Sequence, residues 1–140
     1  MKARRVVVTG IGALTPIGNN LQQYWESLVS GVSGARRITH FDPSKFKTQF
    51  ACEIKDFEPT NFIHRKEARR LDKFTQYAMV VADQAVTDSG ININEINQDR
   101  AGVIWGSGIG GMETFFHESA NFGKSNGDPR FNPFFIPKLI

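Results

Sequence analysis

Residues 101–112 read AGVIWGSGIGGM, an apolar run followed at once by a glycine-rich loop. Short apolar runs that contain β-branched residues and are closed by glycine are typical of buried strands. The beginning of the chain repeats this arrangement, because RVVVT at residues 5–9 precedes GIGALTPIG at residues 10–18. Each loop leads into a pattern of helical periodicity. Strands that alternate with helices favour an α/β architecture.

The first helix is expected directly after the amino-terminal loop. Asn19 or Asn20 can cap it, and Gly31 is expected to end it. Its apolar face consists of Leu21, Tyr24, Trp25, Leu28 and Val29. Residues 32–47 are expected to be irregular. Residues 50–55 alternate between apolar and polar side chains, which predicts a half-buried strand.

A long helix is expected from about His64 to Ser89, with Gly90 directly after its end. Its inner stripe consists of Leu71, Phe74, Ala78, Val81, Ala82 and Ala85. A further helix is expected after Gly111. Together these patterns predict one domain over residues 1–140.

The composition is that of a soluble globular chain. Of the 140 residues, 40% are hydrophobic and 22% are charged, as in ordinary folded domains. The longest apolar run, Ala78 to Ala82, is far shorter than the ~20 residues of a membrane-spanning helix. Only residues 6–8 form an apolar run after the basic residues at the start, so we expect no secretory signal. We therefore expect a cytoplasmic protein without a membrane partner.

Positive charge is concentrated in the first part of the chain, although the net charge is only +3. Lys66, Arg69, Arg70 and Lys73 share one face of the predicted long helix at spacings of three and four residues. Such a face suggests an anionic partner, while a merely solvated helix face is the alternative. Nucleic acid is not favoured, since residues 64–73 offer no aromatic or polar side chains to read bases.

The glycine-rich loop invites a nucleotide-binding interpretation. Gly106, Gly108 and Gly111 fit the pattern G-x-G-x-x-G between a predicted strand and a predicted helix. The acidic residue that should end a second strand is missing, because Asp128 lies in a predicted turn. Tight turns between strand and helix are the favoured reading, and no cofactor is expected.

No catalytic or metal site emerges from the cysteine and the histidines. Cys52 lies in a predicted strand beside Glu53, whereas a reactive thiolate needs an electropositive setting. We expect Cys52 to be a passive buried thiol. His40, His64 and His117 do not have the spacing of metal ligands. We therefore expect neither a catalytic residue nor a bound metal in this chain.

The end of the chain is unusually aromatic. Six of the twelve phenylalanines fall between Phe115 and Phe135, and the last seven residues read FFIPKLI. A domain seldom ends on such an apolar run. Either the segment packs against a partner chain or the sequence is a piece of a longer protein, and the second explanation is favoured.

Several stretches together resemble the β-ketoacyl-acyl-carrier-protein synthases of bacterial fatty-acid synthesis, above all the elongating synthase II type. The resemblance covers essentially the whole chain. It rests on RRVVVTGIG at residues 4–12, TPIGN at 15–19, HFD at 40–42, RKE at 65–67, RLD at 70–72, QY at 76–77, GSGIGG at 106–111 and PFFIP at 133–137.

The resemblance implies the amino-terminal part of a thiolase-like αβαβα fold, incomplete in this chain, from an enzyme that acts as a homodimer. It implies an acyltransferase that extends fatty acyl chains by decarboxylative condensation with malonyl carrier protein. The family's nucleophilic cysteine and two active-site histidines lie downstream of residue 140, so this chain alone is expected to be inactive.

The resemblance also assigns roles to residues that are present. Lys66, Arg69 and Arg70 match positions that bind the acidic acyl carrier protein, and Arg65 and Lys73 could add to their field. Ile109 matches the residue that gates the acyl pocket. Phe134 matches a residue that reaches this pocket across the dimer interface.

Two classes of function remain open at this point. The first is a carrier-binding and pocket-forming segment of an acyltransferase. The second is a stand-alone α/β domain, either a non-catalytic binding module or a nucleotide-binding domain.

Overall fold

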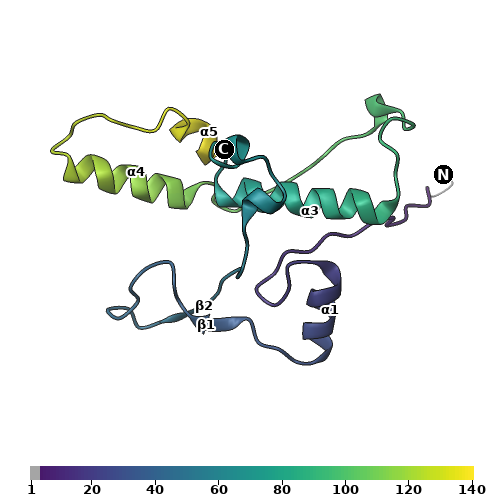
Figure 1. Ribbon diagram of the computed structural model, residues 1–140, viewed down its shortest axis with the longest axis horizontal. Helices are drawn as coiled ribbons and strands as arrows, with labels where there is room; N and C mark the ends of the chain where they lie inside the picture. Colours follow the sequence, from purple (N-terminus) through teal and green to yellow (C-terminus); the bar gives the residue numbers. More distant parts are fainter. Residues whose placement is uncertain (1–3) are drawn as a thin grey trace. The chain divides into compact units, whose positions relative to one another are not determined.

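The computed structural model describes residues 4–140, which form two compact units (Figure 1). The first unit comprises residues 4–57 and 81–94, and the second comprises residues 58–80 and 95–140. The elements are, in chain order, α1 (Leu21–Val29), β1 (Ala35–Arg37), β2 (Phe50–Cys52), the 3-10 helix η1 (Pro59–Asn61), α2 (Arg65–Ala68), α3 (Lys73–Ser89), the 3-10 helix η2 (Gln98–Arg100), α4 (Met112–Lys124) and α5 (Phe135–Leu139).

Helix α1 begins and ends where the sequence predicts. The side chain of Asn20 caps it by accepting a hydrogen bond from the backbone N–H of Gln23 at 2.9 Å. Gly31 follows the helix with φ of +67°, a conformation that glycine adopts without steric cost. Both predictions are confirmed.

Strands β1 and β2 form an antiparallel pair in which Arg36 lies opposite Ala51. The strand predicted from residue 50 onward is confirmed, although it ends at Cys52. Strand β1 corrects the expectation that residues 32–47 are irregular throughout. Glu53 fastens the chain beyond this ladder, because its carboxylate accepts hydrogen bonds from the backbone N–H and the hydroxyl of Thr39. The hydroxyl bond, with the backbone bonds, holds the pKa of Glu53 below its ordinary value.

The predicted amino-terminal strand is wrong. Residues 5–9 form no ladder with any described residue, and Val6 and Val8 are 89% and 80% exposed. The following loop instead packs against α3 within the first unit. The backbone N–H of Ile11 donates to Asp88 and that of Ala13 donates to Gln84, both at 2.9 Å.

The strand predicted at residues 101–105 is also wrong. It pairs with no described strand, and Ile104 is fully exposed. A strand exists only where a neighbour supplies partners for its N–H and C=O groups. The described residues supply none for either β-branched run, so high strand propensity alone leaves both extended and solvated.

The long helix predicted from about His64 to Ser89 is two helices, which corrects the sequence interpretation. Helix α2 ends at Ala68 and α3 begins at Lys73. The buried side chain of Gln76 donates to the carbonyl oxygen of Ala68 at 2.8 Å and thereby satisfies the end of α2. Buried Asp72 precedes α3 and accepts hydrogen bonds from the backbone N–H and the hydroxyl of Thr114. The predicted end is confirmed, since Gly90 follows α3 with φ of +65°.

Helices α4 and α5 pack against each other in the second unit (Figure 1). The helix expected after Gly111 is confirmed as α4. A Cβ atom on Gly111 would collide with the backbone carbonyl of Lys138, so only glycine allows α5 to approach this closely. Stacked rings of Phe122, Phe131 and Phe135 line the junction, with centroids 5.3 and 5.5 Å apart.

The buried apolar side chains of the described residues, Ile63, Ala68 and Val80, all lie in the second unit. None of the helices in the described part of the chain has both the length and the apolar character needed to cross a membrane.

Gly12 is expected to be intolerant of a side chain. A Cβ atom there would overlap the carbonyl oxygen of Val81 in α3, whereas a Cβ atom on Gly102 would meet nothing within 4 Å. Gly12→Ala should therefore lower the free energy of unfolding by about 1–3 kcal/mol, the usual cost of overpacking. Urea denaturation measures this difference. The matched control Gly102→Ala should leave it unchanged or slightly raised, and equal effects of the two substitutions would contradict the packing of the loop on α3.

Candidate functional site

A groove in the second unit brings together three basic side chains and an aromatic loop. Lys66, Arg69 and Arg70 line one side, and the segment Asn132, Pro133 and Phe134 lines the other. The basic residues come from α2 and the turn after it, and the opposite wall directly precedes α5. Residues that lie more than sixty positions apart in sequence therefore share one surface depression.

The basic wall is positioned by the short helix α2 and its ends. The side chain of His64 caps α2 by accepting from the N–H of Lys66 at 3.3 Å. At the other end, the N–H of Arg70 donates to the carbonyl oxygen of Glu67 at 2.8 Å, which closes the turn. The turn presents Arg69 and Arg70 on the exposed side, while Ala68 is buried.

Asn132 organises the opposite wall. Its backbone N–H donates to the carboxylate of Glu118 on α4 at 3.0 Å. Its side-chain oxygen accepts from the N–H of Phe134 at 2.9 Å, and its carbonyl oxygen accepts from the N–H of Phe135 at 2.8 Å. These bonds fix the ring of Phe134 beside the basic wall. The guanidinium carbon of Arg70 lies 5.1 Å from the centroid of this ring, a cation–π geometry.

The positive charges of the groove are not neutralised internally. No carboxylate in residues 4–140 forms an ion pair with Lys66, Arg69 or Arg70. Such a group of cations produces a positive potential over the groove.

Lys73 does not belong to this group, which corrects the four-residue helical face. Because the helix breaks before Lys73, this residue begins α3 and its ammonium group lies 3.0 Å from the carboxylate of Glu113 on α4. The same carboxylate lies 3.9 Å from the imidazole of His117. Nearby Tyr77 is half-buried, and this burial raises its pKa above the ordinary value.

The other residues singled out by the sequence lie apart from the groove. Arg65 is exposed on α2 but does not line it. Ile109 is 72% exposed in the loop before α4 and is likewise absent from the lining. Phe134 is the one predicted pocket residue that the structure brings together with the basic residues.

The sequence favoured a structural role for the glycine-rich loop over nucleotide binding. The structure shows such a role only for the glycines at the end of this loop. Gly110 has φ of +73°, and Gly111 lies against α5. Side chains on Gly106 or Gly108 would meet nothing within 4 Å in the described part of the chain.

Cys52 is exposed on β2, which corrects the expectation that it is buried. Each histidine has a partner elsewhere: His40 lies 3.8 Å from Glu53, His64 caps α2, and His117 lies near Glu113. Among the described residues no hydrogen bond joins a histidine to Cys52.

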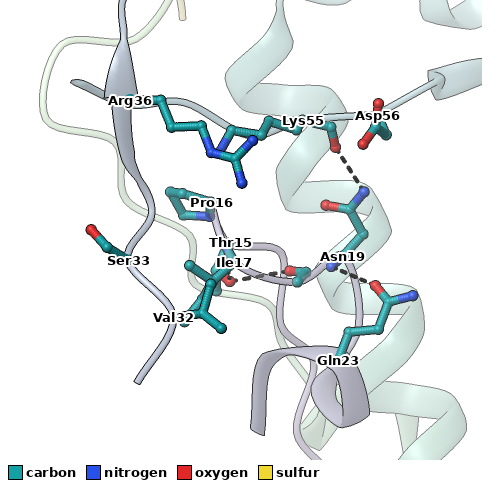
Figure 2. A pocket seen from close by; sticks show the side chains of 11 residues that line it. Thr15, Pro16, Ile17, Asn19, Gln23, Val32, Ser33, Arg36, Lys55 and Asp56 are labelled. Atoms are coloured by element: carbon teal, nitrogen blue, oxygen red, sulfur yellow. Dashed lines mark hydrogen bonds between the residues drawn. The ribbon is translucent and has the colours of Figure 1, made fainter. Parts of the chain in front are cut away.

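A second pocket lies in the first unit (Figure 2). The turn at residues 15–19 forms its floor, and Arg36 and Lys55 add positive charge. Neither residue stands out in the sequence, because the two lie nineteen positions apart and share no helical or strand spacing.

Comparison with known proteins assigns the family. The sequence model of the β-ketoacyl synthase amino-terminal domain matches residues 3–139. The chain therefore belongs to the β-ketoacyl synthase family, as the resemblance implied.

Curated relatives narrow the comparison to one enzyme type. The chain is 44% identical over 140 residues to 3-oxoacyl-[acyl-carrier-protein] synthase 2 of Synechocystis sp.. It is 48% identical over 137 residues to the synthase 2 of Staphylococcus aureus strain COL and 45% identical over 140 residues to that of Coxiella burnetii. These matches cover 98–100% of the chain and 33–34% of the relatives, so the chain spans about a third of their length.

Solved structures show the same fold. The ishigamide ketosynthase/chain length factor matches 98% of this chain and 34% of its own, with a TM-score of 0.79 and 32% identity. A β-ketoacyl synthase from Burkholderia phymatum STM815 matches with a TM-score of 0.71 and 24% identity. The chain is thus a helix-rich part of the thiolase-like α/β fold, which confirms the predicted fold class.

Asn132 and Pro133 are the lining residues that sequence reasoning did not single out. The quoted PFFIP stretch contains Pro133, but nothing in the sequence places it opposite Arg70. The available signal was Asn132, an amide residue of the type that caps short helices, directly before the aromatic run.

The contact between Arg70 and Phe134 should contribute measurably to stability. A double-mutant cycle with Arg70→Met and Phe134→Leu is expected to give a coupling energy of about 0.5–1 kcal/mol, as for other exposed cation–π pairs. Urea denaturation of the four proteins measures it. Pairing Phe134→Leu with Arg100→Met, a cation outside the groove, should give no coupling. A coupling energy of zero between Arg70 and Phe134 would contradict the cation–π contact across the groove.

Proposed function

We propose that this chain is part of a condensing enzyme that extends fatty acyl chains. The reaction joins an acyl thioester to malonyl carrier protein with loss of carbon dioxide. The names of the relatives, 3-oxoacyl-[acyl-carrier-protein] synthase 2, support this activity. The observation that carries the proposal is the groove that joins three unpaired cations to an aromatic wall. The nucleotide-binding alternative is not favoured, because the family match covers residues 3–139.

The groove binds the acidic acyl carrier protein through Lys66, Arg69 and Arg70. Their unpaired charges attract an acidic partner over a distance of about one Debye length and thereby accelerate encounter. Arg65 lies outside the lining but adjoins it on α2 and strengthens the same field. One solved relative of the same fold supports this partner, since it is described as a type II PKS acyl-carrier protein in complex with its ketosynthase bound to the hexaketide (TM-score 0.76, 21% identity).

Phe134 and Ile109 contribute to the acyl pocket. Phe134 offers an aromatic surface directly beside the carrier-binding cations of its own chain. The side chain of Phe134 reaches the acyl pocket across the interface of a homodimer. Ile109 gates the pocket, and its 72% exposure leaves its side chain available for contact with an acyl chain.

The chemical steps belong to parts of the enzyme outside this chain. A cysteine nucleophile and two histidines perform them, and the segment over residues 1–140 alone is inactive. As a partial domain it supplies carrier contacts, pocket elements and dimer elements. The enzyme works in the cytoplasm and needs no cofactor.

Charge reversal in the groove tests carrier binding. In the enzyme that contains this chain, Arg69→Glu with Arg70→Glu should weaken binding of acyl carrier protein and lower its salt dependence, mainly through a slower association rate. Stopped-flow association at several salt concentrations measures both effects. Acyl substrates without carrier protein should react at nearly the normal rate.

The control for this experiment is Arg100→Glu with Lys124→Glu, which changes the net charge equally at positions outside the groove. The control should leave carrier affinity nearly unchanged. Equal losses in the two double variants, or unchanged affinity in the groove variant, would mean that the groove is only a solvated surface.

Replacement of Ile109 by phenylalanine tests the gate. Extra bulk in an acyl pocket costs about 1–3 kcal/mol where ring and acyl tail overlap, which corresponds to a roughly 5- to 150-fold loss of rate. Ile109→Phe should therefore slow reaction with long acyl chains and spare the shortest. A series of acyl lengths on the folded variant measures this selectivity. Parallel losses at every length would identify Ile109 as a packing residue of the loop rather than a gate.

A further inference from the structure

The pocket of the first unit has the size of a small-ligand site. Its volume is about 220 Å³, below the roughly 300–1,000 Å³ of sites for drug-sized ligands. Its lining comes from four parts of the unit: the turn at residues 15–19, Gln23 of α1, the segment that carries Val32, Ser33 and Arg36, and the pair Lys55 and Asp56 (Figure 2). A ligand of a few heavy atoms fits this space.

Hydrogen bonds hold the floor of the pocket in place. The backbones of Thr15 and Gly18 exchange two hydrogen bonds, at 2.8 and 3.2 Å. The side chain of Asn19 donates to the carbonyl oxygen of Lys55 at 2.8 Å (Figure 2). The hydrogen bond from Asn19 ties the backbone that carries Lys55 to the floor of the pocket.

The wall that carries Arg36 is also fixed. Arg36 lies on β1 and pairs with Ala51 of β2. Gly34 brings this wall against the floor, since a Cβ atom there would lie 2.8 Å from the Cβ of Pro16. Both basic residues therefore extend from backbone whose position is already determined, which reduces the entropy lost when a ligand binds.

Arg36 and Lys55 place two positive charges in the lining of this pocket. Among residues 4–140, neither Arg36 nor Lys55 forms an ion pair with a carboxylate. In Figure 2 both side chains extend over Pro16, whereas the carboxylate of Asp56 lies at the other end of the pocket. Like charges that line one small pocket repel each other, and an anion placed between them removes this penalty.

We propose that this pocket binds a phosphate group, either as inorganic phosphate or at the end of a small phosphomonoester. A guanidinium presents a planar pair of donors that matches phosphate oxygens, and an ammonium group adds a point charge. A dianion balances both cations, which a single carboxylate does not. This site is distinct from the proposed carrier-binding groove, because the two share no lining residue.

An NMR titration of the ¹⁵N-labelled protein with inorganic phosphate tests the site, at constant ionic strength maintained with chloride. Saturable shifts are expected at the amides of residues 17–19 and 33–36. Arg36→Gln and Lys55→Gln should each weaken affinity about tenfold or more, since hydrogen bonds to charged groups contribute about 1.5–3 kcal/mol. The unperturbed amides of each variant report whether it remains folded.

Arg37→Gln is the matched control, because Arg37 follows Arg36 on β1 with the same charge but does not line the pocket. It should bind phosphate as the unchanged protein does. Equal weakening by Arg36→Gln and Arg37→Gln would overturn the proposal in favour of diffuse charge attraction, as would shifts that never saturate.

A parallel titration with methyl phosphate distinguishes the two sources of the phosphate group. Binding of both ligands supports a site for phosphomonoesters, and binding of inorganic phosphate alone supports a site for the free ion. Binding of neither overturns the proposal.

Discussion

The hydrogen bond from the buried amide of Gln76 to the carbonyl oxygen of Ala68 determines where the basic residues of the second unit lie. It satisfies the end of α2 and stabilises the turn before α3. Without that turn, one continuous helix would carry Lys66, Arg69, Arg70 and Lys73 as a straight stripe. With it, three of the four cations line the groove, and the fourth pairs with Glu113.

Asp72 connects this turn to the rest of the unit. Its buried carboxylate accepts two hydrogen bonds from Thr114 at the start of α4. A buried carboxylate is costly unless it is hydrogen-bonded, so this contact is strongly constrained. Helix α4 in turn holds Asn132 through Glu118. Both walls of the groove are therefore attached to α4, and this shared attachment sets the distance between them.

The second half of α3 serves the first unit in a similar way. Gln84 accepts from the N–H of Ala13 and donates to the carbonyl oxygen of Asn19. One amide side chain thus holds the amino-terminal loop at its middle and at the residue that follows it. The pocket with Arg36 and Lys55 rests on that loop, so both charged sites depend on glutamine side chains that project from α3.

The sequence by itself determined the elements that local chemistry controls, the family and the α/β class. Asn20 capped α1 because its side chain reaches the third N–H beyond it, and Gly31 and Gly90 ended helices because they tolerate positive φ. Motifs such as GSGIGG and PFFIP identified the family without any three-dimensional information, and the family match over residues 3–139 bears this out. They also indicated Lys66, Arg69, Arg70 and Phe134 as site residues.

Only the tertiary structure decided which of these residues meet. Residues 5–9 and 101–105 have strong strand propensity, yet neither segment forms a ladder with any described residue. A strand needs a neighbouring segment to supply its hydrogen-bond partners, and its own sequence does not provide one. The break before Lys73 depends on Gln76 and Thr114, which no periodicity connects to it. Arg70 lies beside Phe134, and Arg36 lines the same pocket as Lys55, because distant segments of the chain contact each other. A local pattern of residues does not predict such contacts.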